Sequence, residues 1–175
     1  MALNPHAEDF DDFYRRTAQS VVHLIYATTG DLTVAQDCTQ EAYARAWSRW
    51  SSVGRYEQPL SWVRTVARRL ATSAWRHDHS GVRAMRLAQA SVAHAPAPSE
   101  DRVAILTALA QLSPVHRETI ALHYLADLSI EQIALETGRP IGTVKAHLHR
   151  GRGQLAELLR STPDITSEPT KKVPS

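Results

Sequence analysis

Apolar residues recur every three or four positions along most of this 175-residue sequence, and strictly alternating polar and apolar patterns are almost absent. This spacing predicts amphipathic helices, because an α-helix completes a turn in about 3.6 residues and gathers such positions on one face. We therefore predict an all-α fold. Helices are expected over residues 9–29, 33–50, 60–77, 114–126, 129–137 and 140–160, with one more beginning near residue 101.

Between residues 80 and 99 the sequence changes character. Alanine dominates, Pro96 and Pro98 alternate with it, and bulky apolar residues are sparse. This composition is typical of a flexible linker. The sequence thus predicts two small helical domains, 1–79 and 100–161, joined by the linker 80–99. The polar, proline-containing segment 162–175 is predicted to be disordered.

The composition argues against several functional classes. Cys38 is the only cysteine, which excludes an intramolecular disulfide and a zinc site built from several cysteines. No stretch approaches the roughly 20 apolar residues that cross a bilayer, and the acidic N-terminus has no apolar signal core. No phosphate-binding glycine loop, nucleophile motif or paired carboxylate site occurs. We expect a cytoplasmic protein that is not an enzyme, binds no metal or cofactor, and does not insert stably into a membrane.

The segment 129–152 has the layout of a helix-turn-helix motif. Ser129 and Gln132 form a capping-box pattern that starts a short helix, and Gly138 ends it. Pro140 then opens a longer second helix. Such a motif can place its second helix in the major groove of DNA.

The second helix of this motif is predicted to have two distinct faces. Its buried stripe consists of Ile141, Val144, Leu148 and Leu155. The rest of its surface has no acidic residue between Glu136 and Glu157, whereas solvated faces normally mix both charges. Small side chains there allow deep entry into the major groove, and basic ones reach phosphates or guanine edges. The predicted contacts with duplex DNA are Arg139, Thr143, Lys145, Ala146, His147, His149, Arg150 and Arg152.

The helix predicted over 60–77 carries a second basic surface, with no acidic residue between Glu57 and Asp78. Its apolar face is expected to be buried and its arginines to lie opposite. Trp75 falls on the arginine side, where it either stacks on unpaired bases or packs under the linker. The preceding loop, 51–59, could offer an aromatic ring to a flipped base. The predicted contacts of this second surface are Arg55, Tyr56, Arg64, Arg68, Arg69, Thr72, Trp75 and Arg76.

Both halves together resemble the extracytoplasmic-function (ECF) family of bacterial RNA polymerase sigma factors, over most of residues 10–159. The stretch LSPVHRETIALHYLADLSIEQIALETGRPIGTVKAHLHRGRGQL resembles region 4 of that family. AQDCTQEAYARAW resembles region 2.2, and WVRTVARRLATSAWRH resembles the end of region 2.3 and region 2.4. Two family patterns in the right order across a linker are more specific than either alone.

The resemblance implies a partner for each surface. The helix over 33–50 would dock on the clamp helices of core RNA polymerase through Asp37, Gln40, Glu41 and Arg45. The loop and helix over 51–77 would bind and help melt the minus-ten element of promoter DNA, and the last helix would read the minus-thirty-five element. An anti-sigma factor is implied as a further partner. Trp47 also matches the docking helix, although its spacing favours a place in the core.

The sequence departs from the family at four positions. The family commonly has asparagine and aspartate where Arg69 and Ser73 stand, and often serine and arginine where Ala146 and His147 stand. The loss of an arginine that contacts a base costs about 1–3 kcal/mol of discrimination at one base pair. The DNA sequence that this chain prefers therefore cannot be copied from relatives.

Two other functions fit parts of the sequence. A stand-alone helix-turn-helix repressor or activator would bind palindromic half-sites as a dimer without polymerase. A metal or catalytic site could use His77, Asp78 and His79, although a polar helix end explains them as well. Cys38 could sense redox state, but its place on an apolar stripe is typical of a buried thiol.

Overall fold

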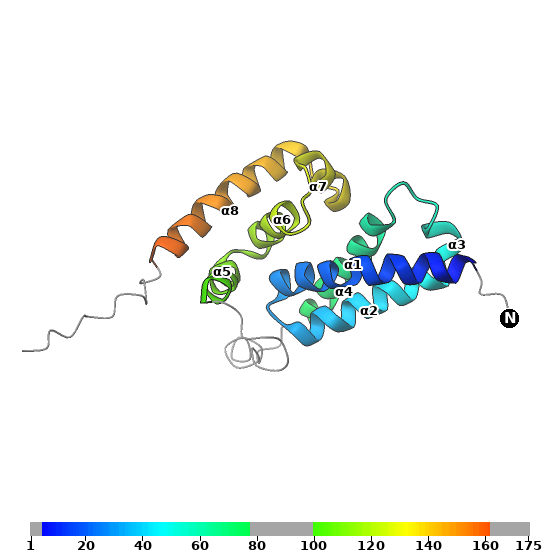
Figure 1. Ribbon diagram of the computed structural model, residues 1–175. Helices are drawn as coiled ribbons and strands as arrows, with labels where there is room; N and C mark the ends of the chain where they lie inside the picture. Colours follow the sequence, from blue (N-terminus) through cyan, green and yellow to red (C-terminus); the bar gives the residue numbers. More distant parts are fainter. Residues whose placement is uncertain (1–4, 78–99, 162–175) are drawn as a thin grey trace, which may run out of the picture.

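The computed structural model describes residues 5–77 and 100–161, and every regular element within them is an α-helix (Figure 1). The prediction of an all-α fold is confirmed. The linker predicted over 80–99 and the tail predicted over 162–175 lie outside the described residues. None of the described helices is long and apolar enough to cross a membrane. The helices are α1 (Pro5–Thr29), α2 (Leu32–Ser48), α3 (Trp50–Val53), α4 (Pro59–His77), α5 (Glu100–Gln111), α6 (Pro114–Tyr124), α7 (Ile130–Thr137) and α8 (Ile141–Ser161).

Turn and cap residues set the ends of the helices. Gly30 has a φ of 72° and ends α1, and the Asp31 side chain then accepts a hydrogen bond of 3.0 Å from the Val34 amide to start α2. Ser113 caps α6 in the same way, with Pro114 as its first residue. The prediction of a continuous loop over 51–59 was wrong in part, because the four-residue helix α3 enters it.

Helices α1, α2 and α4 pack around the first core, and α1 and α2 run side by side (Figure 1). Val21, Ile25, Ala35 and Val63 are almost fully buried there. The hydroxyl groups of Thr17 and Tyr43 lie 2.6 Å apart, and burial raises the pKa of Tyr43 to about 12. A cluster of aromatic rings closes the end of this core near α3, where the ring centres of Phe10 and Trp50 are 5.1 Å apart.

The second core lies among α5, α6, α7 and α8, but it also takes in the end of α1. Ile120, Ile133 and Val144 form its centre, and Leu24 and Ala27 of α1 are only 1% and 5% exposed within it. The side chains of α1 therefore serve two cores, and the two helical groups are packed together along it.

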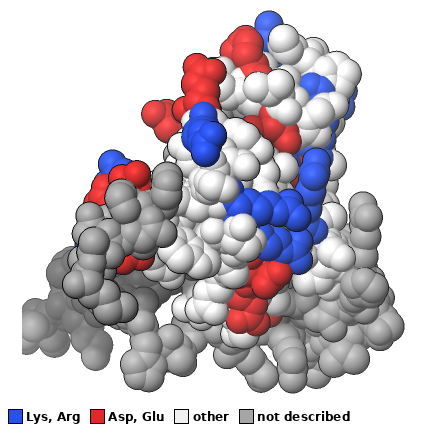
Figure 2. Space-filling model, turned by 90° about the vertical axis from the view of Figure 1, so that its right-hand side faces the viewer, with Lys and Arg blue, Asp and Glu red and all other residues white. Residues whose placement is uncertain are grey.

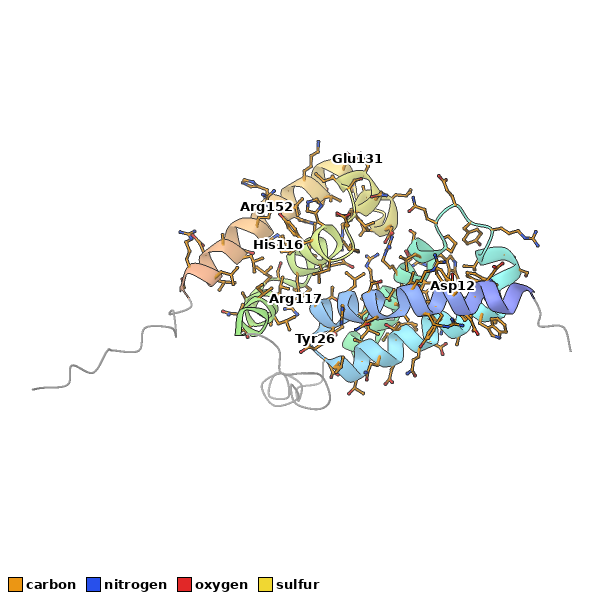
Figure 3. The ribbon with its side chains drawn as sticks, in the orientation of Figure 1. Asp12, Tyr26, His116, Arg117, Glu131 and Arg152 are labelled. Carbon is orange, nitrogen blue, oxygen red and sulfur yellow. The ribbon has the colours of Figure 1, made fainter. Side chains whose placement is uncertain are left out.

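A half-buried arginine reinforces this junction. Nη1 of Arg117, in α6, donates to the carbonyl of Thr28 in α1 at 3.2 Å, and its Nη2 donates to the carbonyls of Ala110 and Leu112. Burial lowers the pKa of this guanidinium from its ordinary value. Figure 3 shows Arg117 between the α5–α6 region and α1. One side chain thus ties the end of α1 to the start of the second group of helices.

A glycine allows α6 and α8 to approach closely. Gly151 is buried, and a Cβ atom placed there would lie 3.0 Å from Cγ1 of Ile120 and 3.3 Å from Cβ of His116. Gly153, two residues later on the same helix, is exposed and would meet nothing within 4 Å. The two glycines therefore have different roles, although both lie inside α8.

We expect Gly153→Ala to raise the free energy of unfolding by about 0.5–1 kcal/mol, because alanine favours a helix over glycine. Gly151→Ala gains the same propensity but crowds Ile120, and overpacking of a core costs about 1–3 kcal/mol. Its net effect should be destabilising. Urea unfolding of the two variants measures the difference, and equal stabilisation by both would show that α6 and α8 do not need the glycine.

Candidate nucleic-acid interface

Helices α7 and α8 form a helix-turn-helix. The predicted capping box is present: the Ser129 amide donates to Oε1 of Gln132 at 2.8 Å, and the Gln132 amide donates to the Ser129 hydroxyl at 3.2 Å. Gly138 has a φ of 68° and lets the chain turn sharply after α7. Val144 and Leu148 pack α8 against the core. Ile141 was predicted to belong to this buried stripe, but it is 45% exposed because it is the first residue of α8.

The predicted contacts with duplex DNA on α8 are mostly accessible. Lys145, His149, Arg150 and Arg152 are exposed, and Figure 3 shows Arg152 on the outer side of the helix. Thr143, Ala146 and His147 are half-buried, as is Arg139 before the helix. The exposed face of α8 is therefore basic and carries no acidic side chain before Glu157.

His147 lies in a positively charged, partly enclosed position. Its ring centre is 5.6 Å from that of His116, and its Nδ1 atom is buried without a hydrogen-bond partner. Desolvation first, and then the charge of Arg139, lower the pKa of His147 from its ordinary value of 6.5. The ring is therefore neutral at pH 7 and adds no positive charge to α8.

Two arginines of α4 were predicted to be exposed on a basic surface, and this was wrong. Arg64 is only 7% exposed and Arg68 is mostly buried, because α6 and α7 cover this face of α4. Of the same predicted set, Arg69 and Thr72 are exposed. Trp75 and Arg76 belong to the last turn of α4, but their side chains lie outside the described part of the structure.

Both covered arginines form ion pairs with the second group of helices. Arg64 donates from Nη2 and Nε to the carboxylate of Glu136, whose side chain is only 3% exposed. Arg68 donates from Nη2 and Nε to Oε1 of Glu118 at 2.7 and 3.0 Å. These pairs join α4 to α7 and to α6.

Glu118 holds a second arginine. Its Oε2 lies 2.7 Å from Nη1 of Arg139, one of the residues predicted to contact duplex DNA. Burial alone would raise the pKa of Glu118, but the charges of Arg68 and Arg139 outweigh burial, so the pKa lies below its ordinary value. The carboxylate is therefore ionised at neutral pH and binds one arginine from each predicted DNA surface.

The loop before α4 borders a shallow pocket of about 370 Å³. Trp50, Gly54 and Arg55 line it from one side, and Asp12 and Arg16 of α1 line it from the other. Arg55 and Tyr56 are exposed, as predicted, with 49% of the tyrosine accessible. Figure 2 looks onto this end of the molecule and shows a compact group of basic side chains bordered by acidic ones.

The polar ridge predicted on α2 is exposed. Asp37, Gln40, Glu41 and Arg45 all reach solvent, and Nε of Arg45 donates to Oε1 of Glu41 at 2.7 Å. The spacing favoured a core position for Trp47, and this was wrong. Trp47 is 49% exposed at the end of this ridge, with one face against Phe10 at 5.0 Å between ring centres.

Within the described residues, no group of three or more potential ligands could hold a metal ion. Of the polar cluster His77, Asp78 and His79, the side chain of the first residue and all of the other two lie outside those residues. Cys38 is buried, as its position on the apolar stripe predicted.

The sequence did not point to Glu118, Glu136 or Arg117. Each is an ordinary charged residue on a helix. The arginine partners of the two glutamates lie 50 or more positions away in the sequence. The available signal was charge complementarity: α4 has no acidic residue of its own to pair with its arginines, so acidic partners had to come from another helix. That signal becomes specific only when the packing of α4 against α6 and α7 is known.

Comparison with family models assigns both groups of helices. Residues 13–80 match the model described as Sigma-70 region 2, and residues 102–155 match the model described as Sigma-70, region 4. The sigma factor RpoE of Bartonella quintana, solved in complex with the anti-sigma factor NepR, has the same fold. It superposes with a TM-score of 0.74 at 28% identity, over 89% of this chain and 99% of that one.

Curated relatives agree. The ECF RNA polymerase sigma factor SigL of Mycobacterium tuberculosis is 35% identical over 127 residues, which cover 69% of this chain and 72% of that protein. The RNA polymerase sigma factor CarQ of Myxococcus xanthus is 32% identical over 157 residues, covering 86% and 88%. These matches support the sigma-factor interpretation and not the alternative of a stand-alone regulator. A region 2 bundle, a region 4 helix-turn-helix and relatives along most of the sequence show that this chain belongs to the ECF sigma factors, which bind core RNA polymerase and direct the initiation of transcription.

Proposed function

We propose that the two predicted DNA-binding surfaces divide promoter recognition between them. Helix α8 reads the minus-thirty-five element as duplex DNA, and α4 with the loop before it binds the minus-ten element. The observation that carries the proposal is the exposed face of α8, where Lys145, His149, Arg150 and Arg152 stand on a capped helix-turn-helix without an acidic neighbour.

The minus-ten surface combines charge with a place for a base. Arg55 and Trp50 line the pocket, and Tyr56 is exposed next to Arg55 in the sequence, so a base that leaves the duplex would gain stacking and shelter there. Capture of such a base favours open strands, since it lowers the free energy of the melted state only. Arg64, Arg68, Arg69 and Thr72 would contact the backbone of the same element.

Each surface alone would bind DNA weakly and mostly through phosphates. Docking of both surfaces on one polymerase makes the second contact intramolecular and raises its effective concentration. The ridge Asp37, Gln40, Glu41 and Arg45 supplies that docking, because it is exposed, polar and separate from both DNA surfaces. Selectivity then requires both promoter elements at a fixed separation.

The chain itself performs no covalent chemistry in this proposal and acts in the cytoplasm, where its polymerase works. An anti-sigma factor restrains it until an envelope or environmental stress arises. The complex of RpoE with NepR supports the proposal of an anti-sigma partner, because this chain matches RpoE over 99% of the RpoE chain.

Arg150→Ala should weaken recognition of the minus-thirty-five element by about 1–3 kcal/mol, a loss of roughly five- to 150-fold at subsaturating protein. The matched control is Arg160→Ala, which removes the same charge from an exposed residue at the far end of α8. The measurement is transcription in vitro with core polymerase on a genomic library, whose runoff products identify a cognate promoter. Equal activity of the two variants on that promoter would rule out a reading role for Arg150.

Gln40→Ala should weaken binding to core polymerase about two- to 13-fold, since a lost interfacial hydrogen bond costs about 0.5–1.5 kcal/mol. Gln19→Ala, at another exposed glutamine, on α1, serves as the control. Fluorescence anisotropy of labelled protein titrated with core polymerase gives both affinities. If both substitutions have the same effect, the ridge on α2 is not the docking surface.

His147 should titrate below 6.5, and Arg139→Gln should raise its midpoint because a positive neighbour is removed. A folded-state pKa below the unfolded value means that the unfolded chain binds more protons in this window. The contribution of His147 to stability is therefore complete above about pH 6.5 and declines as the pH falls below that value. NMR of the histidine ring protons from pH 5 to 8 measures the midpoint, and a value at or above 6.5 would contradict the assignment.

A further inference from the structure

A pair of histidine rings lies between α6 and α8, beside the exposed basic face of α8. The rings of His116, on α6, and His147, on α8, meet edge to face with their centres 5.6 Å apart. Nδ1 of His116 donates to Oε1 of Gln154 at 2.9 Å, which fixes this ring against α8. Figure 3 shows His116 on α6, next to α8. Both rings belong to region 4, so their contact does not depend on region 2.

His147 has no protein acceptor for a second ring proton. The residue is half-buried, and its Nδ1 atom is buried without a hydrogen-bond partner. A protonated imidazole carries a proton on both nitrogens, and a buried donor without an acceptor is unfavourable. The ring avoids this cost when it is neutral and carries its one proton on Nε2. A protonated ring therefore needs a compensating negative charge nearby.

Most charged neighbours of His147 are positive. Desolvation lowers its pKa most, followed by the charges of Arg139 before α8, His116 on α6 and Arg150 on α8. Glu118 of α6 acts in the opposite direction, but its carboxylate is already paired with arginines. The local field thus opposes a proton on the ring and favours an anion beside it.

The other helices that pack on α8 do not supply this anion. On α7, the carboxylate of Glu136 is paired with Arg64, and Glu131 is exposed to solvent. The described side chains of α5, residues 105–111, include no charged group. An anion that neutralises the position beside His147 must therefore come from a bound partner.

We propose that a backbone phosphate of the minus-thirty-five element binds beside Arg139, His147 and Arg150, and that His147 takes up a proton when it binds. A helix that enters the major groove has the phosphates of the two strands along its margins. The proposal rests on the proposed function, since it places α8 in that groove. It adds that recognition of this element is coupled to pH.

The sign of the coupling follows from the charge of the phosphate. A negative charge close to the ring raises the pKa of His147 in the complex above its value in the free chain. Between these two values binding takes up a proton, so the affinity for the promoter rises as the pH falls. A shift of about one pKa unit changes the affinity by at most about tenfold. We therefore expect His147 to contribute a rise of about three- to tenfold from pH 8 to pH 5.5.

The test compares His147→Gln with His23→Gln in the full chain assembled with core polymerase. Both substitutions remove one titratable ring, but His23 is exposed on α1 and lies outside the predicted DNA surfaces. Fluorescence anisotropy of a labelled cognate promoter gives the affinity from pH 5.5 to pH 8. The control variant should keep the rise of the wild type. In His147→Gln the rise should be about three- to tenfold smaller.

Two further variants separate charge from shape, and they keep the test decisive if His147→Gln folds poorly. His147→Arg carries a permanent charge, so its affinity at pH 8 should approach that of the wild type at pH 5.5. His116→Phe keeps an aromatic ring against His147 but removes a positive charge, so the rise should move to higher pH. A merely structural role of His116 would lower the affinity equally at every pH.

Equal pH profiles in the wild type, His147→Gln and His147→Arg would overturn the proposal. A promoter with a scrambled minus-thirty-five sequence separates this failure from failure of the proposed function. If the chain discriminates against the scrambled promoter but the profiles are equal, α8 reads the element without a coupled proton. If it does not discriminate but the rise depends on His147, the phosphate contact exists and the proposed reading of the element fails.

Discussion

The arrangement of the whole molecule depends on the burial of two side chains of α1. Leu24 and Ala27 leave the core of region 2 and enter the core of region 4, where they are almost completely covered. The burial of a leucine side chain is worth about 1.5–3 kcal/mol, and this gain is lost only if the two regions part. Everything else at the junction depends on this contact, because it brings α6 and α7 over the basic face of α4.

The charged contacts specify the arrangement more than they stabilise it. A buried ion pair gains attraction but loses the hydration of both groups, and the two effects often nearly cancel. The loss of one partner is different, because an unpaired buried charge costs about 3–5 kcal/mol. Arg64 with Glu136 and Arg68 with Glu118 therefore select one way of packing region 4 on region 2. The apolar contact at Leu24 holds the two regions together, and the ion pairs determine how region 4 is oriented on region 2.

The helices and the reading motif could be predicted from the sequence because their signals are local. Ser129 and Gln132 lie within one turn, and the glycine that ends α7 needs no distant partner to adopt a positive φ. The exposed face of α8 followed from periodicity and the absence of acidic residues. The ridge on α2 could be placed in the same way.

The environment of α4 could not be predicted for the opposite reason. The helical wheel placed Arg64 and Arg68 away from the core of their own domain, and this is correct for that domain. Their burial comes from a second domain whose position no short-range pattern encodes. The prediction that Trp47 lies in the core was also wrong. A tryptophan at helical spacing is usually buried, but about half of Trp47 faces solvent at the end of the exposed ridge on α2.

The mixed character of the junction makes it sensitive to two physical variables in different ways. Contacts such as that of Leu24 weaken on cooling, because the hydrophobic effect is largely entropic near room temperature. The ion pairs of the junction are partly accessible to solvent at Glu118 and Arg139, and dissolved salt weakens them by screening the charges. Low temperature therefore weakens the apolar contacts of the junction, and high ionic strength weakens its ion pairs. The two regions are expected to pack most tightly in a warm solution of low ionic strength. The packing of region 4 on region 2 is therefore expected to be weakest at low temperature and high ionic strength.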